Sequence, residues 1–237
     1  MTETEEIAKA IQETAKVAQR GMEITEKAAG FFAKVLGGAP DEVAAMVIDK
    51  LRFVRWKRLM RMSDEVDQIL SERGIGRTRS VPPKLALPIF EDASLEEEPD
   101  IQNLWNHLLA NAMDRNFNSE IRYGFIDMIR AITAREAQLL SQMYSDLEKN
   151  SVTRPLSDLS QHYWDKEELM EKVSLSADEY VVAANNLMRM QLVSAAIFKG
   201  GISIGVGQGS DKLTVYKGID AITMTGLGVL FVEACTK

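Results

Sequence analysis

The chain has 237 residues, of which 46% are hydrophobic and 27% are charged, and its formal net charge is −7. This composition is typical of a soluble globular protein, and the acidic balance argues against broad, non-specific binding of nucleic acid by the whole molecule. The only cysteine, Cys235, has no partner for an internal disulfide, and the acidic first residues are unlike a signal peptide, so we expect a cytoplasmic protein.

Residues 1–40 are predicted to form an amphipathic helix that is bent near Gly21 and Gly30. Its apolar residues recur at spacings of three and four and form a thin stripe: Ile7, Ile11, Ala15, Ala18 and Met22. Such a helix should pack on another helix or on a second chain, which predicts a homo-oligomer. The apolar stretch at 28–39 contains Lys34 and is shorter than the roughly 20 residues of a membrane-spanning helix. A peripheral contact with the membrane remains an alternative.

A second helix is expected over residues 41–72, with Met46, Phe53, Trp56 and Met60 on one face. Its segment "RFVRWKRLMR" is a local reversal of charge, and it supplies the candidate partner-binding residues Arg52, Arg55, Lys57, Arg58 and Arg61. Because arginine suits bidentate contacts with carboxylates, we expect an acidic partner segment within the chain or on another molecule. A solvated basic face is the alternative.

The stretch at 81–100 begins with two prolines that suit the first turn of a short helix, and Pro88 is expected to kink or end that helix. Ser94 and Glu97 have the spacing of a capping box for the next helix. The acidic run at 96–98 would then match the positive end of the helix dipole, and it is also the internal candidate partner for the arginines.

The next helix has a clean apolar stripe: Ile101, Leu104, Trp105, Leu108, Leu109, Ala112 and Met113. On the opposite side we expect a polar face with the candidate residues Asn103, Asn106 and His107, together with Asp114. His107 is expected to be a surface histidine or part of a polar contact with a neighbouring element. A general base would need a partner and a pocket, and the sequence indicates neither.

A helix is expected over 121–149, and the character of the sequence changes after about residue 134. Residues 165–195 predict a helix, a tight turn and a second helix with Ser176 as its N-cap. Strand-like segments with glycine-rich turns follow, and then a terminal helix: "LVSAAIF", "GISIGV", "KLTVY", "AITMT" and "GLGVLFVEACTK". Helix, turn, helix and β-hairpin is the order of a winged helix.

The predicted fold class is therefore mainly α with a small β part, in which an N-terminal helical region precedes a winged-helix-like C-terminal domain. The expected division is an N-terminal amphipathic helix at 1–40, a helical domain at 41–133 and a winged-helix-like domain at 134–237. Its second helix starts with Asp178 and Glu179 and has Arg189 as its only cation. Helices that read DNA need cations for phosphate, so we favour a protein-binding winged helix and expect no nucleic acid partner, although Asn185 and Asn186 could face bases.

Motifs for chemistry are sparse. "GVGQG" at 205–209 lacks the Gly-Lys-Ser/Thr ending of a phosphate loop and is better explained as a hairpin turn. Two histidines, His107 and His162, are too few for a zinc site, and Cys235 lacks the surroundings of a nucleophile. We therefore expect no catalytic residue, no metal and no cofactor.

Three stretches together resemble the Abi-alpha family, bacterial proteins linked to abortive infection against phage: "LRFVRWKRLMRMSDEVDQILSERGIG", "VPPKLALPIFEDASLEEEPDIQNLWNHLLANAMD" and "AITMTGLGVLFVEAC". The resemblance spans about residues 45–235 and implies a cytosolic defence protein rather than an enzyme. The expected function is a non-enzymatic component of antiphage defence that acts through protein–protein interaction or self-association. The alternatives are a winged-helix DNA-binding transcriptional regulator and a membrane-directed effector that uses the N-terminal helix.

Overall fold

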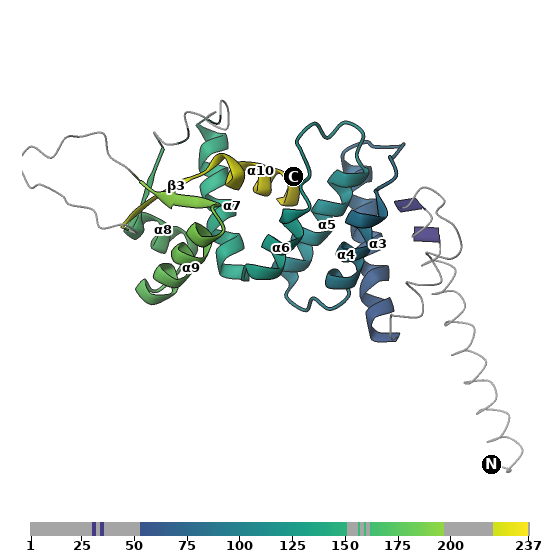
Figure 1. The fold of residues 1–237 in the computed structure, drawn as a ribbon, viewed down its shortest axis with the longest axis horizontal. Helices are drawn as coiled ribbons and strands as arrows, with labels where there is room; N and C mark the ends of the chain where they lie inside the picture. Colours follow the sequence, from purple (N-terminus) through teal and green to yellow (C-terminus); the bar gives the residue numbers. More distant parts are fainter. Residues whose placement is uncertain are drawn as a thin grey trace, which may run out of the picture. The chain divides into compact units, whose positions relative to one another are not determined.

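The computed structural model is mainly helical, with a small three-stranded antiparallel sheet, which confirms the expectation of a mainly α protein with a small β part (Figure 1). It describes residues 30–31, 34–35, 53–150, 156, 159, 162–196 and 220–236. The chain divides into two compact units, unit 1 over Met1–Asn118 and unit 2 over Ser119–Lys237.

In the part of unit 1 that the structure describes from residue 53 on, three helices pack against one another: α3 (Phe53–Glu72), α4 (Pro83–Ala93) and α5 (Pro99–Met113). Its core consists of apolar residues that recur every three or four positions: Leu59, Met62, Val66 and Leu70 from α3, Leu85, Ile89 and Phe90 from α4, and Leu104, Trp105, Leu108 and Met113 from α5. The stripe predicted for α5 is buried throughout, so this expectation is confirmed. Of the face predicted for α3, Met60 is buried, Met46 lies outside the described residues, and the side chains of Phe53 and Trp56 are likewise not described.

Helix α3 ends at a glycine, as predicted. Gly74 has φ +70°, and its N–H donates to Ser71 O (2.9 Å) while the N–H of Ile75 donates to Leu70 O (2.9 Å). This pair of bonds is the Schellman arrangement, and the left-handed backbone that it needs is accessible to glycine without strain.

Two local expectations in α4 are wrong. Pro88 neither ends nor visibly breaks α4, which continues to Ala93, because burial of Ile89 and Phe90 offsets the one backbone hydrogen bond that proline removes. Ser94 is the C-cap of α4 and donates through Oγ to Glu91 O (2.7 Å), so it does not cap α5. Helix α5 has Glu98 as its N-cap, without a capping hydrogen bond from the side chain.

Of the four described residues of the N-terminal segment, Phe31, Lys34 and Val35 contact the rest of unit 1, and Gly30 is exposed. The ring of Phe31 is 4% exposed and meets the ring of Phe90 edge to face, with 5.5 Å between centroids. Val35 is fully buried and accepts a hydrogen bond from Val81 N (2.7 Å), and Lys34 Nζ lies 2.5 Å from Asp67 Oδ1. The rest of the predicted 1–40 helix lies outside the described residues.

Unit 2 contains five helices and three strands in its described part. The helices are α6 (Gly124–Ala131), α7 (Ala134–Lys149), α8 (Lys166–Val173), α9 (Ala177–Arg189) and α10 (Gly226–Thr236). The strands are β1 (Trp164–Asp165), β2 (Val193–Ala195) and β3 (Ala221–Met224). They are antiparallel in the order β1–β3–β2, with Trp164 opposite Ile222 and Ser194 opposite Thr223.

The helix expected over 121–149 is two helices, which corrects that prediction. Thr133 has an extended backbone and accepts from Glu136 N, while the Glu136 carboxylate accepts from Thr133 N (2.6 Å). This capping box starts α7 and ends continuity with α6. The predicted N-cap of α9 is confirmed, because Ser176 forms the same box with Glu179.

The boundary between the two units falls at 118/119, earlier than the 133/134 boundary expected from the sequence. The reason is that α6 packs within unit 2, where the rings of Phe125 and Phe231 meet edge to face at 5.6 Å. Strand β1 was not expected, while β2 and β3 arise from two of the predicted strand segments. The segments "GISIGV" and "KLTVY" lie outside the described residues.

Candidate functional site

The predicted polar face of α5 is directed at α3. Asn106 is 2% exposed, its Nδ2 donates to the carboxylate of Glu65 on α3, and its Oδ1 accepts from Gln102 Nε2 (3.2 Å). Asn103, by contrast, is exposed. Asn106 therefore lies in the interface between α5 and α3, while Asn103 lies on a side of α5 that stays open to solvent.

His107 takes part in the same interface. Arg73, just after α3, donates through Nη1 to Asn111 Oδ1 (2.6 Å) and places Nη2 3.2 Å from His107 Nδ1. A guanidinium only donates, so Nδ1 of His107 accepts and its lone pair is occupied. Of the two roles left open for His107, the polar contact with a neighbouring element is the one observed. Burial lowers the pKa of Arg73, against the opposing charge of Asp114.

We name this set of contacts the polar seam: Glu65, Arg73, Gln102, Asn106, His107 and Asn111. Its members come from α3, the residue just after it, and α5, and the bonds that cross from Glu65 and Arg73 to α5 fix the rotation of α5 against α3. Arg79 extends the set by donating from Nε to Ala112 O (2.8 Å) at the end of α5. Because these side chains bond one another, the role of the polar seam is to stabilise the packing of α5 on α3.

The candidate partner-binding cations differ in whether they form ion pairs within the described part of the chain. Arg58 Nη2 lies 2.5 Å from Glu97 Oε1, and Nη1 donates to Leu95 O (3.0 Å), so Arg58 holds the end of α4 and the acidic run. Arg61 makes only a long contact with Glu65 (3.8 Å). In the described part of the chain, neither the half-buried Arg55 nor the exposed Lys57 has an ion pair. Arg52 lies outside that part.

We call Lys57 and Arg61 the basic face of α3; Arg55, two positions before Lys57, lies on another side of the helix. Lys57 and Arg61 are one helical turn apart and therefore point to the same side. Sequence reasoning located these cations, but it could not tell which of them the chain itself would neutralise.

The outer face of α9 is formed by Asp178, Val182, Asn185 and Arg189, which are all exposed. Val182 is 68% exposed, the most open large apolar residue among those the structure describes. Arg189 donates twice to Asn186 Oδ1 (3.1 and 2.7 Å), and Asn186 Nδ2 donates to Ala131 O (3.1 Å) and to Glu136 (2.8 Å). Asn186 is thus held against α6 and α7.

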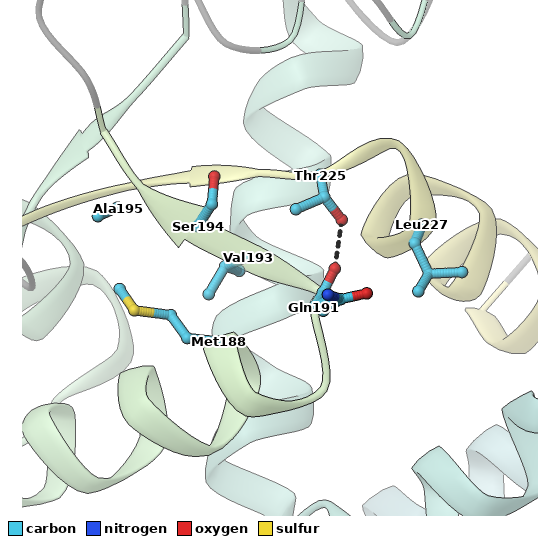
Figure 2. A pocket seen from close by; sticks show the side chains of 7 residues that line it. All are labelled: Met188, Gln191, Val193, Ser194, Ala195, Thr225 and Leu227. Carbon is cyan, nitrogen blue, oxygen red and sulfur yellow. Dashed lines mark hydrogen bonds between the residues drawn. The ribbon is translucent and has the colours of Figure 1, made fainter.

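Beside α9, a groove of about 510 Å³ runs along strand β2. Figure 2 shows its lining: Met188, Gln191, Val193, Ser194, Ala195, Thr225 and Leu227. The hydroxyl of Thr225 donates to Gln191 O (2.6 Å) across one end (Figure 2). The lining has no ionisable side chain, so the groove offers shape and apolar contact rather than acid–base chemistry.

Unit 2 also has a partly buried set of polar groups around one carboxylate, which we call the carboxylate cluster and define by Asp146, Gln142, Trp164 and Lys172. Asp146 accepts from Trp164 Nε1 (3.1 Å), Lys172 Nζ (2.8 Å) and Gln142 Nε2 (3.0 Å). Burial alone would raise the pKa of Asp146, but the hydrogen bonds from Lys172, Trp164 and Gln142 outweigh it and lower that pKa. The cluster ties α7 to β1 and α8.

The cysteine thiol and the side chains that could bind a metal ion do not form a further candidate site in the described part of the chain. Burial raises the pKa of the Cys235 thiol well above its usual value, which leaves the thiol protonated and inert. Throughout the described ranges, no three His, Cys, Asp or Glu side chains gather as a metal ion would need. No helix in those same ranges is long and apolar enough to cross a bilayer.

The fold places the chain among mainly helical proteins with a small sheet and exposed charged faces. It does not by itself identify a reaction. The comparison with family models is specific: the abortive infection alpha family matches residues 55–235, and the chain belongs to that family. The match confirms the resemblance found in the sequence. No curated protein and no solved structure matches the chain.

Proposed function

We propose that the protein is a non-enzymatic component of abortive infection defence that acts by contact with a protein, either a partner or a second copy of itself. Membership of the abortive infection alpha family supports the biological setting. The observation that carries the contact mechanism is the outer face of α9, where Val182 is 68% exposed between Asp178 and Asn185.

A valine in this position is costly in an isolated helix. It is β-branched, which lowers its helix propensity, and it leaves apolar surface in water. Covering a valine side chain completely contributes about 1.5 kcal/mol or more, so a partner that packs on α9 would gain from the exposure. The anionic start of α9 suits a partner with cations near its apolar contact.

A winged-helix interpretation of unit 2 is part of this proposal. The order α7, β1, α8, α9, β2 and β3, with the sheet order β1–β3–β2, supports it. In DNA-binding members of that class, the helix equivalent to α9 would enter the major groove. Here Asp178 and Glu179 would oppose phosphate, and Arg189 is bonded to Asn186. These features favour protein contact over transcriptional regulation.

A membrane-directed effector receives less support. Phe31, one of the two phenylalanines that would have to reach lipid, is 4% exposed and stacked on Phe90. Its burial favours packing of this segment on unit 1.

The test is Val182→Asp in cells that carry the gene, scored by plaque formation after phage challenge. We expect protection to fall strongly, with the free energy of unfolding unchanged within about 1 kcal/mol because the site is exposed. Leu95→Asp is the matched control, since Leu95 is 49% exposed in unit 1, and it should keep protection. Full protection with Val182→Asp would contradict the proposal. Tight binding of the gene's upstream DNA, lost on Asn185→Ala with Arg189→Ala, would favour the regulator instead.

A further inference from the structure

We propose that copies of this chain associate head to tail, with the basic face of α3 in one copy on an acidic surface of α8 and α9 in the next. This inference rests on the proposed function, because it identifies the protein partner as a second copy. The acidic surface consists of Glu167, Glu171 and Asp178, with Val182 beside it.

The acidic surface is open and uncompensated. Glu167 and Glu171 are exposed, lie one turn apart on the same side of α8, and have no ion pair among the described residues. Asp178 is exposed in the first turn of α9 and is equally without an ion pair in that part of the chain. Its neighbour Glu179 is already used by the capping box.

Glu167 lies near α9 as well as on α8. Burial is the main cause of the raised pKa of Tyr180 on α9, and the charges of Asp220 and Glu167 add to the rise. Figure 1 shows α8 and α9 side by side, and the two helices are in contact. The carboxylate of Glu167 on α8 is therefore close enough to α9 to act on Tyr180.

The basic face of α3 is the complement. Lys57 is exposed without an ion pair in the described ranges, and the side chain of Arg61 is 58% exposed with Glu65 no closer than 3.8 Å. Arg58 is excluded, because Glu97 and the end of α4 already occupy it. The ion pair between Arg58 and Glu97 shows that a cation of this helix binds a carboxylate within the chain.

Charge complementarity within one sequence argues for a second copy as the occupant. Among its described residues, each molecule carries both the basic face of α3 and the acidic surface, so every copy supplies the complement of the next at equal concentration. Two different surfaces make a heterologous interface, which builds rings or open chains instead of a two-fold dimer. Exposed ion pairs are screened by salt, so the association should weaken as salt rises.

The experiment measures the mass of the full-length chain by sedimentation over a range of concentrations. We expect concentration-dependent assembly of the wild type, with a dissociation constant that rises about tenfold when salt increases well past the physiological range. Lys57→Glu with Arg61→Glu should give monomers, and so should Glu171→Lys with Asp178→Lys. Mixing the two double variants should restore assembly, because each then presents the surface that the other lacks, and the quadruple variant should assemble by itself.

Matched controls reverse exposed charges elsewhere in unit 2. Arg122→Glu with Lys149→Glu, and Glu120→Lys with Asp127→Lys, should keep the wild-type mass profile. A wild type that stays monomeric, or double variants that assemble like the wild type, would overturn the inference. Should the wild type be monomeric while Val182→Asp still abolishes protection, the proposed function stands and its partner is a different protein.

Discussion

The polar seam of unit 1 and the carboxylate cluster of unit 2 both hold secondary-structure elements together through side-chain hydrogen bonds, but they use different groups. The seam joins α3 and α5 mainly through amides, an imidazole and one arginine, with bonds such as Arg73 to Asn111 at 2.6 Å. The cluster joins α7, β1 and α8 through one carboxylate, Asp146, that accepts three hydrogen bonds. The bonds of the seam, including the one to the Glu65 carboxylate, fix the orientation of α5 against α3, and the lowered pKa of Asp146 makes the contribution of the cluster depend on pH.

Close packing of two backbone segments also stabilises unit 2, and it occurs at Gly228. A Cβ added at this position would lie 2.1 Å from Leu192 O, the carbonyl before β2. We expect Gly228→Ala to lower the free energy of unfolding by about 3 kcal/mol, because neither backbone can yield. Urea denaturation followed by circular dichroism measures the loss. Gly124→Ala is the control, since nothing lies within 4 Å of its added Cβ, and equal losses for both variants would show that the contact is unimportant.

The polar seam should be the next most sensitive feature. Arg73→Met keeps the length of the side chain but removes the donors to Asn111 Oδ1 and His107 Nδ1. The expected loss is about 2 kcal/mol in the free energy of unfolding, because partly buried acceptors lose a charged donor. Urea denaturation at neutral pH is the measurement, with the exposed Arg77→Met as control. A loss no larger than that of Arg77→Met would mean that packing alone orients α5.

The contribution of the carboxylate cluster to the free energy of unfolding should depend on pH. The folded-state pKa of Asp146 is lowered, so its stabilisation is complete above the unfolded pKa of about 3.9 and is lost as pH falls through the folded value. Asp146→Asn should cost about 2 kcal/mol at pH 7, and the difference from wild type should shrink below about pH 4.

Chemical denaturation at several pH values checks this prediction. Glu148→Gln, on the exposed side of the same helix, should follow the wild-type curve. A difference between Asp146→Asn and wild type that stays constant from pH 7 down to pH 3 would assign the loss to shape instead of charge.

The smallest expected effect is at the surface pair between α3 and the acidic run. The side chain of Arg58 is 23% exposed and that of Glu97 is 80% exposed. Glu97→Ala should cost at most about 0.5 kcal/mol because solvent screens the pair. Arg58→Ala should cost about 1 kcal/mol, since it also removes the bond to Leu95 O. Thermal melting compares the two, and equal losses would show that the carbonyl contact adds nothing.

Local signals were sufficient where one helix face or one turn decided the structure. The stripe of α5, the glycine that ends α3 and the Ser176 cap of α9 were all predicted, because each depends on residues within a few positions of one another. Family membership was also visible in the sequence, from stretches spread over most of the chain. Local signals misled at Ser94, whose capping-box spacing competes with its use as the C-cap of α4.

By itself, the sequence determined a mainly helical protein with a small sheet, the family to which it belongs, and the cations of α3 as a feature of interest. Only the tertiary structure decided which polar residues are buried. Asn106 and His107 contact partners that are 41 and 34 positions away in the sequence, and no spacing rule connects residues so far apart. The tertiary structure also separated Arg58, which pairs with Glu97, from Lys57, which has no ion pair within the described ranges. The physical reason is that periodicity reports one helix at a time, whereas hydrogen bonds and ion pairs depend on how two helices meet.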